Sequence, residues 1–224
     1  MARVNAAPIV VYDLDGTLAW TEKYWIPVMA RVLEHIDAEY QWQSAVQDPR
    51  ELLRWLGHPA QVIMRAIYPQ ASSEAIDHVL EVKAELWGQL LQEYPFELYP
   101  GTLDALKEVQ AMGVRQFVAS NCDEVYLERM LTTTGLGPFI EDAACLGMYP
   151  GIEKKEFTRR LLAGVQHEDG VFVGDSFHDM EAGRHNQLRT VFADYGYGQS
   201  SPELIDRRLS EIRELPGVLG ALFG

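Results

Sequence analysis

An alternation of short apolar runs with longer helical patterns is the feature that most constrains the fold of this chain. Four runs rich in valine, isoleucine or phenylalanine are expected to form buried strands, namely residues 9–12, 114–119, 171–173 and 190–193. Apolar residues between the later runs recur at helical spacing, and Gly113 and Gly135 are typical ends for two such helices. A third helical pattern starts near Phe157 and is expected to end near Gln166. Strands that alternate with helices predict an α/β fold, in which helices cover both faces of a parallel sheet.

Residues 19–98 interrupt this alternation and contain no convincing strand. Ile26, Met29, Leu33 and Ile36 have the spacing of one helical stripe, and a longer helical pattern follows from Ile76 onward. All five tryptophans lie in this stretch, and the turn signal Tyr-Pro-Gly at residues 99–101 marks its end. We therefore predict a Rossmann-like core of residues 1–18 and 99–224, with residues 19–98 inserted as an all-helical domain.

Composition excludes several classes of partner. The 224 residues carry a formal net charge of −14, and a broadly acidic surface repels nucleic acids and anionic lipids. No apolar run has the length of a membrane span, and the first residues lack a secretory signal. Two cysteines are too few for a disulfide framework and form no metal-binding pair. These features predict a cytoplasmic protein that binds neither nucleic acid nor membrane.

Polar residues follow the predicted strands, where ligands bind in open parallel sheets. Lys154 and Lys155 are expected in the loop before the third helix, and either could add a positive charge. The side chains expected to converge at this edge are Asp13 and Asp15 after the first strand, Ser120 and Asn121 after the second, and Asp175 and Asp179 after the third.

The two aspartates at positions 13 and 15 bring negative charges together, and such crowding needs compensation. Mg²⁺ prefers oxygen ligands, often uses one or two carboxylates, and is completed by water and substrate phosphate. Asp13 and Asp175 can supply those carboxylates. A carboxylate can also act as a covalent nucleophile, and a second one nearby can transfer protons. The sequence therefore predicts a divalent cation at this edge, which would also screen an incoming phosphate from the acidic side chains.

In order and approximate spacing, these residues resemble the four motifs of the haloacid dehalogenase superfamily. The matching positions are Asp13-Leu14-Asp15-Gly16-Thr17, Ser120-Asn121, a lysine ahead of a helix, and Gly174-Asp175 with Asp179. The helical insertion resembles the mobile cap of the phosphatase branch. The resemblance covers nearly the whole chain and implies hydrolysis of a small phosphorylated metabolite through an aspartyl-phosphate.

The resemblance also implies a role for each matching residue. Asp13 would be the nucleophile, and Asp15 would protonate the leaving oxygen and then activate water. Asp13, Asp175 and the backbone carbonyl of Asp15 would bind Mg²⁺, with Asp179 in support. The phosphoryl group would be held by Ser120, the backbone amide of Asn121 and Lys154.

Several alternatives remain at this point. Aspartates after a strand can simply cap a turn or a helix, and serine and asparagine are common turn residues. The family often shows Lys-Pro where this chain has Lys154-Lys155, so the choice of lysine is open, with Lys154 favoured. Trp20 stands where relatives often carry an acidic residue, which makes it unsafe to borrow a relative's substrate.

Other functions use overlapping chemistry. A phosphoglucomutase-type transferase would use the same residues, and a non-enzymatic phosphate-binding regulatory protein would use only part of them. A dehalogenase has no use for an acid at Asp15, which argues against that activity. The preferred prediction is a Mg²⁺-dependent phosphatase. Phosphoglycolate-like acids, sugar phosphates and nucleotides are all open as substrates, as is the oligomeric state.

Overall fold

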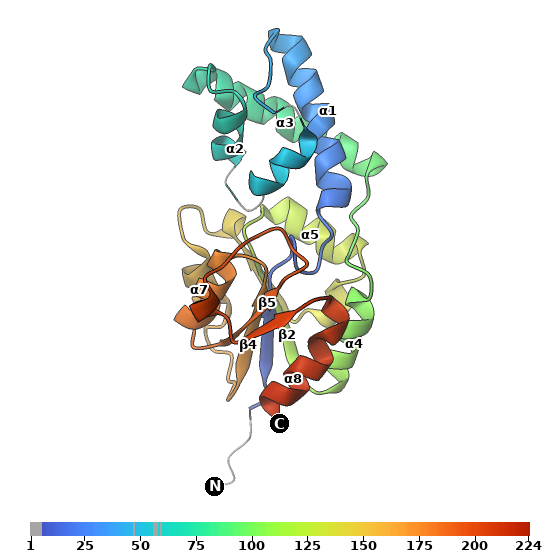
Figure 1. The fold of residues 1–224 in the computed structure, drawn as a ribbon, viewed down its shortest axis with the longest axis vertical. Coiled ribbons are helices and arrows are strands. Elements are labelled where there is room, and N and C mark those ends of the chain that lie inside the picture. Colours follow the sequence, from blue (N-terminus) through green and yellow to red (C-terminus); the bar gives the residue numbers. More distant parts are fainter. Residues whose placement is uncertain (1–5, 47, 56–57, 59) are drawn as a thin grey trace. The chain divides into compact units, whose positions relative to one another are not determined.

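The computed structural model describes residues 6–224 except residues 47, 56, 57 and 59. The described chain forms two compact units. The first, called the sheet unit, contains residues 6–19 and Leu98–Gly224; the second, called the helical unit, is Trp20–Glu97. Figure 1 shows the chain coloured along its length, with the strands in the first unit and helices alone labelled in the second.

A six-stranded parallel sheet is the centre of the sheet unit. Its order is β3-β2-β1-β4-β5-β6, and every neighbouring pair is parallel. The strands are β1 (Ile9–Tyr12), β2 (Arg115–Ser120), β3 (Asp142–Cys145), β4 (Gly170–Gly174), β5 (Arg189–Ala193) and β6 (Arg207–Leu209). The predicted α/β fold is confirmed, but the sequence prediction of four strands missed β3 and β6 at the two edges of the sheet.

Five α-helices accompany the sheet. They are α4 (Thr102–Ala111), α5 (Glu124–Thr133), α6 (Lys154–Leu161), α7 (Phe177–His185) and α8 (Leu215–Phe223). Short 3₁₀ turns lie at Gly137–Phe139, Leu146–Met148, Pro202–Leu204 and Ile212–Glu214. Helices α6 and α7 contact one another and the sheet, while α4 and α8 lie together on its other side (Figure 1). Helix α6 stops at Leu161, earlier than the predicted end near Gln166.

Alternation along the strands explains how the core is filled. Successive side chains of a strand point to opposite faces of the sheet. Ile9 and Val11 of β1 therefore share a face with Phe117 of β2 and Phe172 of β4, and all four belong to one buried cluster with Phe157 of α6. Because both faces of β1 are covered, the whole strand is apolar, and no residue in it is exposed.

The helical unit is built from α1 (Glu22–Tyr40), α2 (Ala60–Ile67), α3 (Ser73–Glu93) and a 3₁₀ segment, Pro49–Trp55. Helix α1 contacts α3, and α2 also packs on α3. Met29, Leu33 and Ile36 of the predicted stripe are buried, together with other residues of α1, whereas Ile26 is only half-buried. None of the helices in the described chain is both long and apolar enough to cross a membrane.

Candidate active site

The register of the sheet brings three distant chain segments to one edge. Tyr12 at the end of β1 lies opposite Val118 of β2 and Val173 of β4. The backbone N–H of Asp13 continues this ladder by donating to the carbonyl of Val173 at 2.9 Å. Asp175 comes directly after β4, so both aspartates leave the sheet at the carboxyl ends of adjacent strands.

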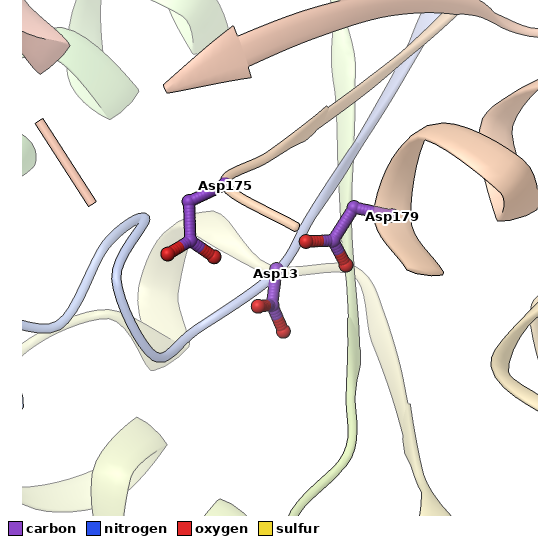
Figure 2. A group of neighbouring side chains, drawn as sticks. All are labelled: Asp13, Asp175 and Asp179. Carbon is purple, nitrogen blue, oxygen red and sulfur yellow. The ribbon is translucent and has the colours of Figure 1, made fainter. Parts of the chain in front are cut away.

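Three buried carboxylates converge at this edge. Asp13, Asp175 and Asp179 each offer an oxygen, and these oxygens all lie within 4.8 Å of one another. Figure 2 shows the three side chains pointing into one space, with Asp179 coming from the first turn of α7. Their exposed fractions are 6%, 5% and 0%, so water does little to screen the repulsion between their negative charges. We call these three residues the carboxylate group.

One lysine is built into the carboxylate group. The Nζ of Lys154 donates to Oδ1 of Asp13 at 2.7 Å and to Oδ1 of Asp179 at 2.5 Å. The Nζ of Lys155 instead contacts Glu153 at 2.9 Å and Glu181 at 3.0 Å. Both lysines belong to the first turn of α6 rather than to the preceding loop, which corrects the sequence prediction. Successive residues of a helix point in different directions, so only one of the pair can face this site.

Burial and repulsion shift the ionisation of these groups. Burial, followed by repulsion from Asp179, raises the pKa of Asp13 well above its usual value, although Lys154 opposes the shift. Burial and Asp179 likewise raise the pKa of Asp175 to about 7. Burial lowers the pKa of Lys154, but attraction to Asp13 and Asp179 outweighs it and raises that pKa overall. The ammonium therefore stays charged at neutral pH.

The loop after β5 fixes one oxygen of Asp175. Its Oδ2 accepts the backbone N–H groups of Tyr197 at 2.7 Å and Gly198 at 2.9 Å. A Cβ atom at Gly196 would lie 2.3 Å from the Cβ of Asp175, so only glycine allows this approach. Sequence reasoning missed this loop. Its signal was a Tyr-Gly-Tyr-Gly stretch at residues 195–198, one residue beyond the fourth predicted strand.

Gly16 approaches the same carboxylate from the turn after β1. Its φ of +79° lies in the left-handed region, and a Cβ there would come within 2.2 Å of Oδ2 of Asp175. Both facts require glycine at this position. The turn containing Asp15 is therefore in contact with the segment that carries Asp175.

Asp179 has its own set of partners. Its Oδ2 accepts the backbone N–H of Ser176 at 2.9 Å and the Ser176 hydroxyl at 2.6 Å. These contacts belong to the start of α7, where a carboxylate is also stabilised by the helix dipole. With Oδ1 bound to Lys154, Asp179 joins the start of α7 to the start of α6.

The other residues predicted for the site do not belong to the carboxylate group. The side chain of Asp15 is half-buried, and its Oδ1 accepts the hydroxyl of Tyr126 at 2.5 Å. Ser120 is buried at the end of β2, paired with Cys145 of β3, and Asn121 follows it half-buried. Trp20 is half-buried in the helical unit, and its indole N–H donates to Glu22 at 2.7 Å.

The carboxylate group has the composition of a metal site. When ionised, its three carboxylates and the ammonium of Lys154 leave two net negative charges, which one divalent cation would neutralise. All of the donors are carboxylate oxygens, the ligands that hard cations prefer. Burial and, after it, repulsion from Asp179 raise the pKa values of Asp13 and Asp175, and a bound cation would oppose this shift by stabilising the ionised carboxylates. The group can therefore hold a metal ion.

Comparisons with known proteins point to one family. A family model described as "Haloacid dehalogenase-like hydrolase" matches residues 10–193. Phosphoglycolate phosphatase 1 of Pseudomonas aeruginosa is 27% identical over 207 residues, which cover 87% of this chain and 72% of that protein. The phosphoglycolate phosphatase of Aquifex aeolicus is 25% identical over 211 residues, which cover 92% of this chain and 94% of that protein.

A solved structure has the same fold. It is described as a predicted phosphoglycolate phosphatase from Haemophilus somnus 129pt, and its TM-score is 0.82 at 19% sequence identity. The match covers 96% of this chain and 99% of that one. Because the family model spans most of the sequence, including every strand that contributes to the carboxylate group, the chain belongs to the haloacid dehalogenase-like hydrolase family.

Proposed function

We propose that this protein hydrolyses a small phosphate monoester with the help of Mg²⁺, through an aspartyl-phosphate formed on Asp13. One observation carries the proposal: a buried carboxylate at the end of a central strand lies within reach of two further carboxylates and a charged lysine. Phosphoryl transfer needs in-line positioning and neutralisation of charge, and this arrangement can provide both.

Asp13 is the proposed nucleophile. Lys154 donates to Oδ1 of its carboxylate, which fixes the orientation of the group. A carboxylate oxygen attacks phosphorus as the bond to the leaving oxygen breaks, and two moderate steps replace one difficult displacement. A bound cation would oppose the upward shift in the pKa of Asp13 and so favour the ionised, nucleophilic form of this carboxyl group.

Asp15 is the proposed acid and base. It gives its proton to the leaving oxygen in the first step and takes a proton from water in the second. Ser120, the backbone amide of Asn121 and Lys154 are the proposed contacts of the phosphoryl oxygens. Lys154 is preferred over Lys155 because its ammonium reaches Asp13, whereas that of Lys155 pairs with surface glutamates.

Mg²⁺ is the proposed cation, held by Asp13, Asp175 and the backbone carbonyl of Asp15, with Asp179 in support. When bound, it would supply the positive charge that stabilises the phosphoryl oxygens in the transition state. Asp179 supports the site through Lys154 and through the start of α7. The helical unit is the proposed cap, which would exclude water and set specificity.

A phosphorylated small carboxylic acid is the first substrate to test. The curated relatives described above are named phosphoglycolate phosphatases, which favours hydrolysis over transfer and phosphoglycolate over larger esters. The formal net charge of −14 gives no reason to add a nucleic acid or an anionic membrane to the proposal. The cytoplasm is the proposed location.

Phosphate release from a panel of phosphorylated metabolites tests the proposal, with phosphoglycolate, sugar phosphates and nucleotides included. Asp13→Asn should reduce turnover at least about 10³-fold while the protein stays folded, because removal of a covalent nucleophile abolishes the main route. Turnover of this variant at the wild-type rate, with deamidation excluded by mass spectrometry, would contradict the assignment. Isomerised sugar phosphate without free phosphate would identify a mutase instead.

A further inference from the structure

A tyrosine contacts the proposed acid and base directly. The hydroxyl of Tyr126 donates to Oδ1 of Asp15 at 2.5 Å, across 111 residues of sequence. Tyr126 lies in the first turn of α5 and is 7% exposed. A short hydrogen bond from a neutral donor to a carboxylate, largely shielded from water, is stronger than one between neutral groups.

Two features hold this hydroxyl in place. Asp123 caps α5, and its Oδ1 accepts the backbone N–H of Tyr126 at 2.7 Å. The ring itself is buried, and a tyrosine side chain has only two flexible torsions to fix. The hydroxyl is thus presented from a capped helix start, whereas Asp15 lies in the turn that follows β1.

We propose that Tyr126 is a positioning residue for proton transfer by Asp15. This inference depends on the proposed function. The Tyr126 hydroxyl fixes the plane of the carboxyl group through Oδ1, which assigns the transferable proton to Oδ2. As a carboxylate oxygen of Asp13 bonds to phosphorus, the leaving oxygen breaks from phosphorus and takes the proton of Asp15. Tyr126 keeps its own proton throughout.

A positioning role makes a specific prediction about leaving groups. An alkoxide, as from phosphoglycolate, leaves poorly and needs the proton, whereas p-nitrophenolate leaves well without one. The value of kcat/KM reports the steps through formation of the aspartyl-phosphate, and later hydrolysis of that intermediate is common to both substrates. Misplacing the proton of Asp15 should therefore lower kcat/KM for the alkyl ester and spare the aryl ester.

The test compares Tyr126→Phe with wild type on the best alkyl phosphate found and on p-nitrophenyl phosphate. We expect kcat/KM to fall about tenfold for the alkyl ester and less than about twofold for the aryl ester, because general acid catalysis contributes only where the leaving group needs it. The matched control is Tyr68→Phe, which removes another tyrosine hydroxyl that donates to an aspartate, Asp37, at 2.9 Å. That control should leave the ratio between the two substrates unchanged.

A second comparison guards against a purely structural effect of the substitution. In an Asp15→Asn background, adding Tyr126→Phe should cause no further loss on the alkyl ester, since the positioned proton is already gone. Equal losses on both esters, no loss on either, or a full additional loss in the Asp15→Asn background would overturn the inference while leaving the proposed phosphatase intact. Absence of phosphate release by the wild-type protein from every ester would instead overturn the proposed function, and the inference with it.

Discussion

The two units of the molecule bury different kinds of side chain. In the helical unit, the buried polar residues among those described are Thr21 and Ser44, neither of which is charged. In the sheet unit, the buried residues include four charged ones, Asp13, Lys154, Asp175 and Asp179. Burying a charge opposes folding unless it is paired. The helical unit therefore follows the ordinary rules of stability, and the sheet unit departs from them where the proposed chemistry lies.

The difference between the two units predicts where a substitution should affect activity and where it should affect stability alone. Charged residues retained in a core against their solvation preference are candidates for function. Apolar residues such as Ile36, which is fully buried in α1, are sufficiently explained by packing. The following experiments test this division, from the largest expected effect to the smallest.

Among the substitutions that follow, replacement of the buried lysine should have the largest effect. Lys154→Ala is expected to lower kcat for phosphate release by about 10²–10³-fold, the range seen when a preorganised electrostatic contact is removed. The matched variant, Lys155→Ala, removes a neighbouring charge that pairs with Glu153 and Glu181, and it should change kcat less than about twofold. A larger loss for Lys155→Ala would assign the phosphate-binding role to Lys155. It would contradict the inference that the buried charge is the one that serves activity.

A core substitution in the helical unit should act on stability. Ile36→Ala is expected to lower the free energy of unfolding by about 2–5 kcal/mol, because it leaves a cavity in a closely packed interior. All five tryptophans lie within residues 20–97, so intrinsic fluorescence during urea denaturation reports on this unit. Val62→Ala in α2 is the control: its side chain is 43% exposed, and the expected change is within about 0.5 kcal/mol. Equal effects of the two variants would refute the packing argument.

Mg²⁺ should stabilise the protein in a pH-dependent way. In metal-free protein the pKa of Asp175 is raised to about 7, above its value in the unfolded chain. The folded state then holds more protons than the unfolded state between about pH 4 and pH 7, so its stability falls as pH rises through that window. Mg²⁺ binds the deprotonated carboxylates and should restore stability mainly at the high-pH end.

Calorimetry with EDTA or with Mg²⁺ measures this effect. At pH 8 and a Mg²⁺ concentration about 100 times Kd, Tm should rise by roughly 5–10 °C, and the rise should be smaller at pH 5.5. Asp175→Asn should lose most of the rise because a ligand is missing. A rise of the same size at both pH values would argue against Asp175 as a ligand that must lose a proton.

The smallest effect is expected at a helix cap. The hydroxyl of Ser72 accepts the backbone N–H of Ala75 at 3.2 Å at the start of α3. Ser72→Ala should lower the free energy of unfolding by about 1 kcal/mol, the usual value of such a cap. Phosphate release should be unaltered, and a loss of kcat in this variant would show that the helical unit carries more of the chemistry than its buried residues suggest.

The fold was predictable from the sequence where apolar runs are buried on both faces. Strand β1 occupies the residues expected, and β2, β4 and β5 begin or end within one residue of the expected runs. The missed strands, β3 and β6, are short edge strands with sequences DAAC and RRL, which carry little of the β-branched or aromatic signal. They form because the neighbouring strand offers backbone groups for hydrogen bonding. A local sequence pattern does not reveal the presence of that neighbour.

The site was predictable to the extent that side chains at strand ends mark it. The structure brings Asp13, Asp175 and Asp179 together at the edge where parallel strands end. Backbone donors leave no such mark, so the N–H groups of Tyr197 and Gly198 that hold Asp175 were missed. The contact of Tyr126 with Asp15 depends on tertiary structure alone, and no local sequence pattern marks it.

The position of Lys154 has a consequence for the order in which the protein matures. In small metal-dependent domains the polypeptide stays unfolded until the ion binds, because metal binding supplies the free energy of folding. Here an ammonium from the chain itself already bridges Asp13 and Asp179. The chain thus carries an internal counterion, so we expect the metal-free polypeptide to complete its fold unaided and to take up its ion afterwards. On the proposed mechanism, protein without Mg²⁺ would be folded but inactive, and addition of the ion alone would activate it.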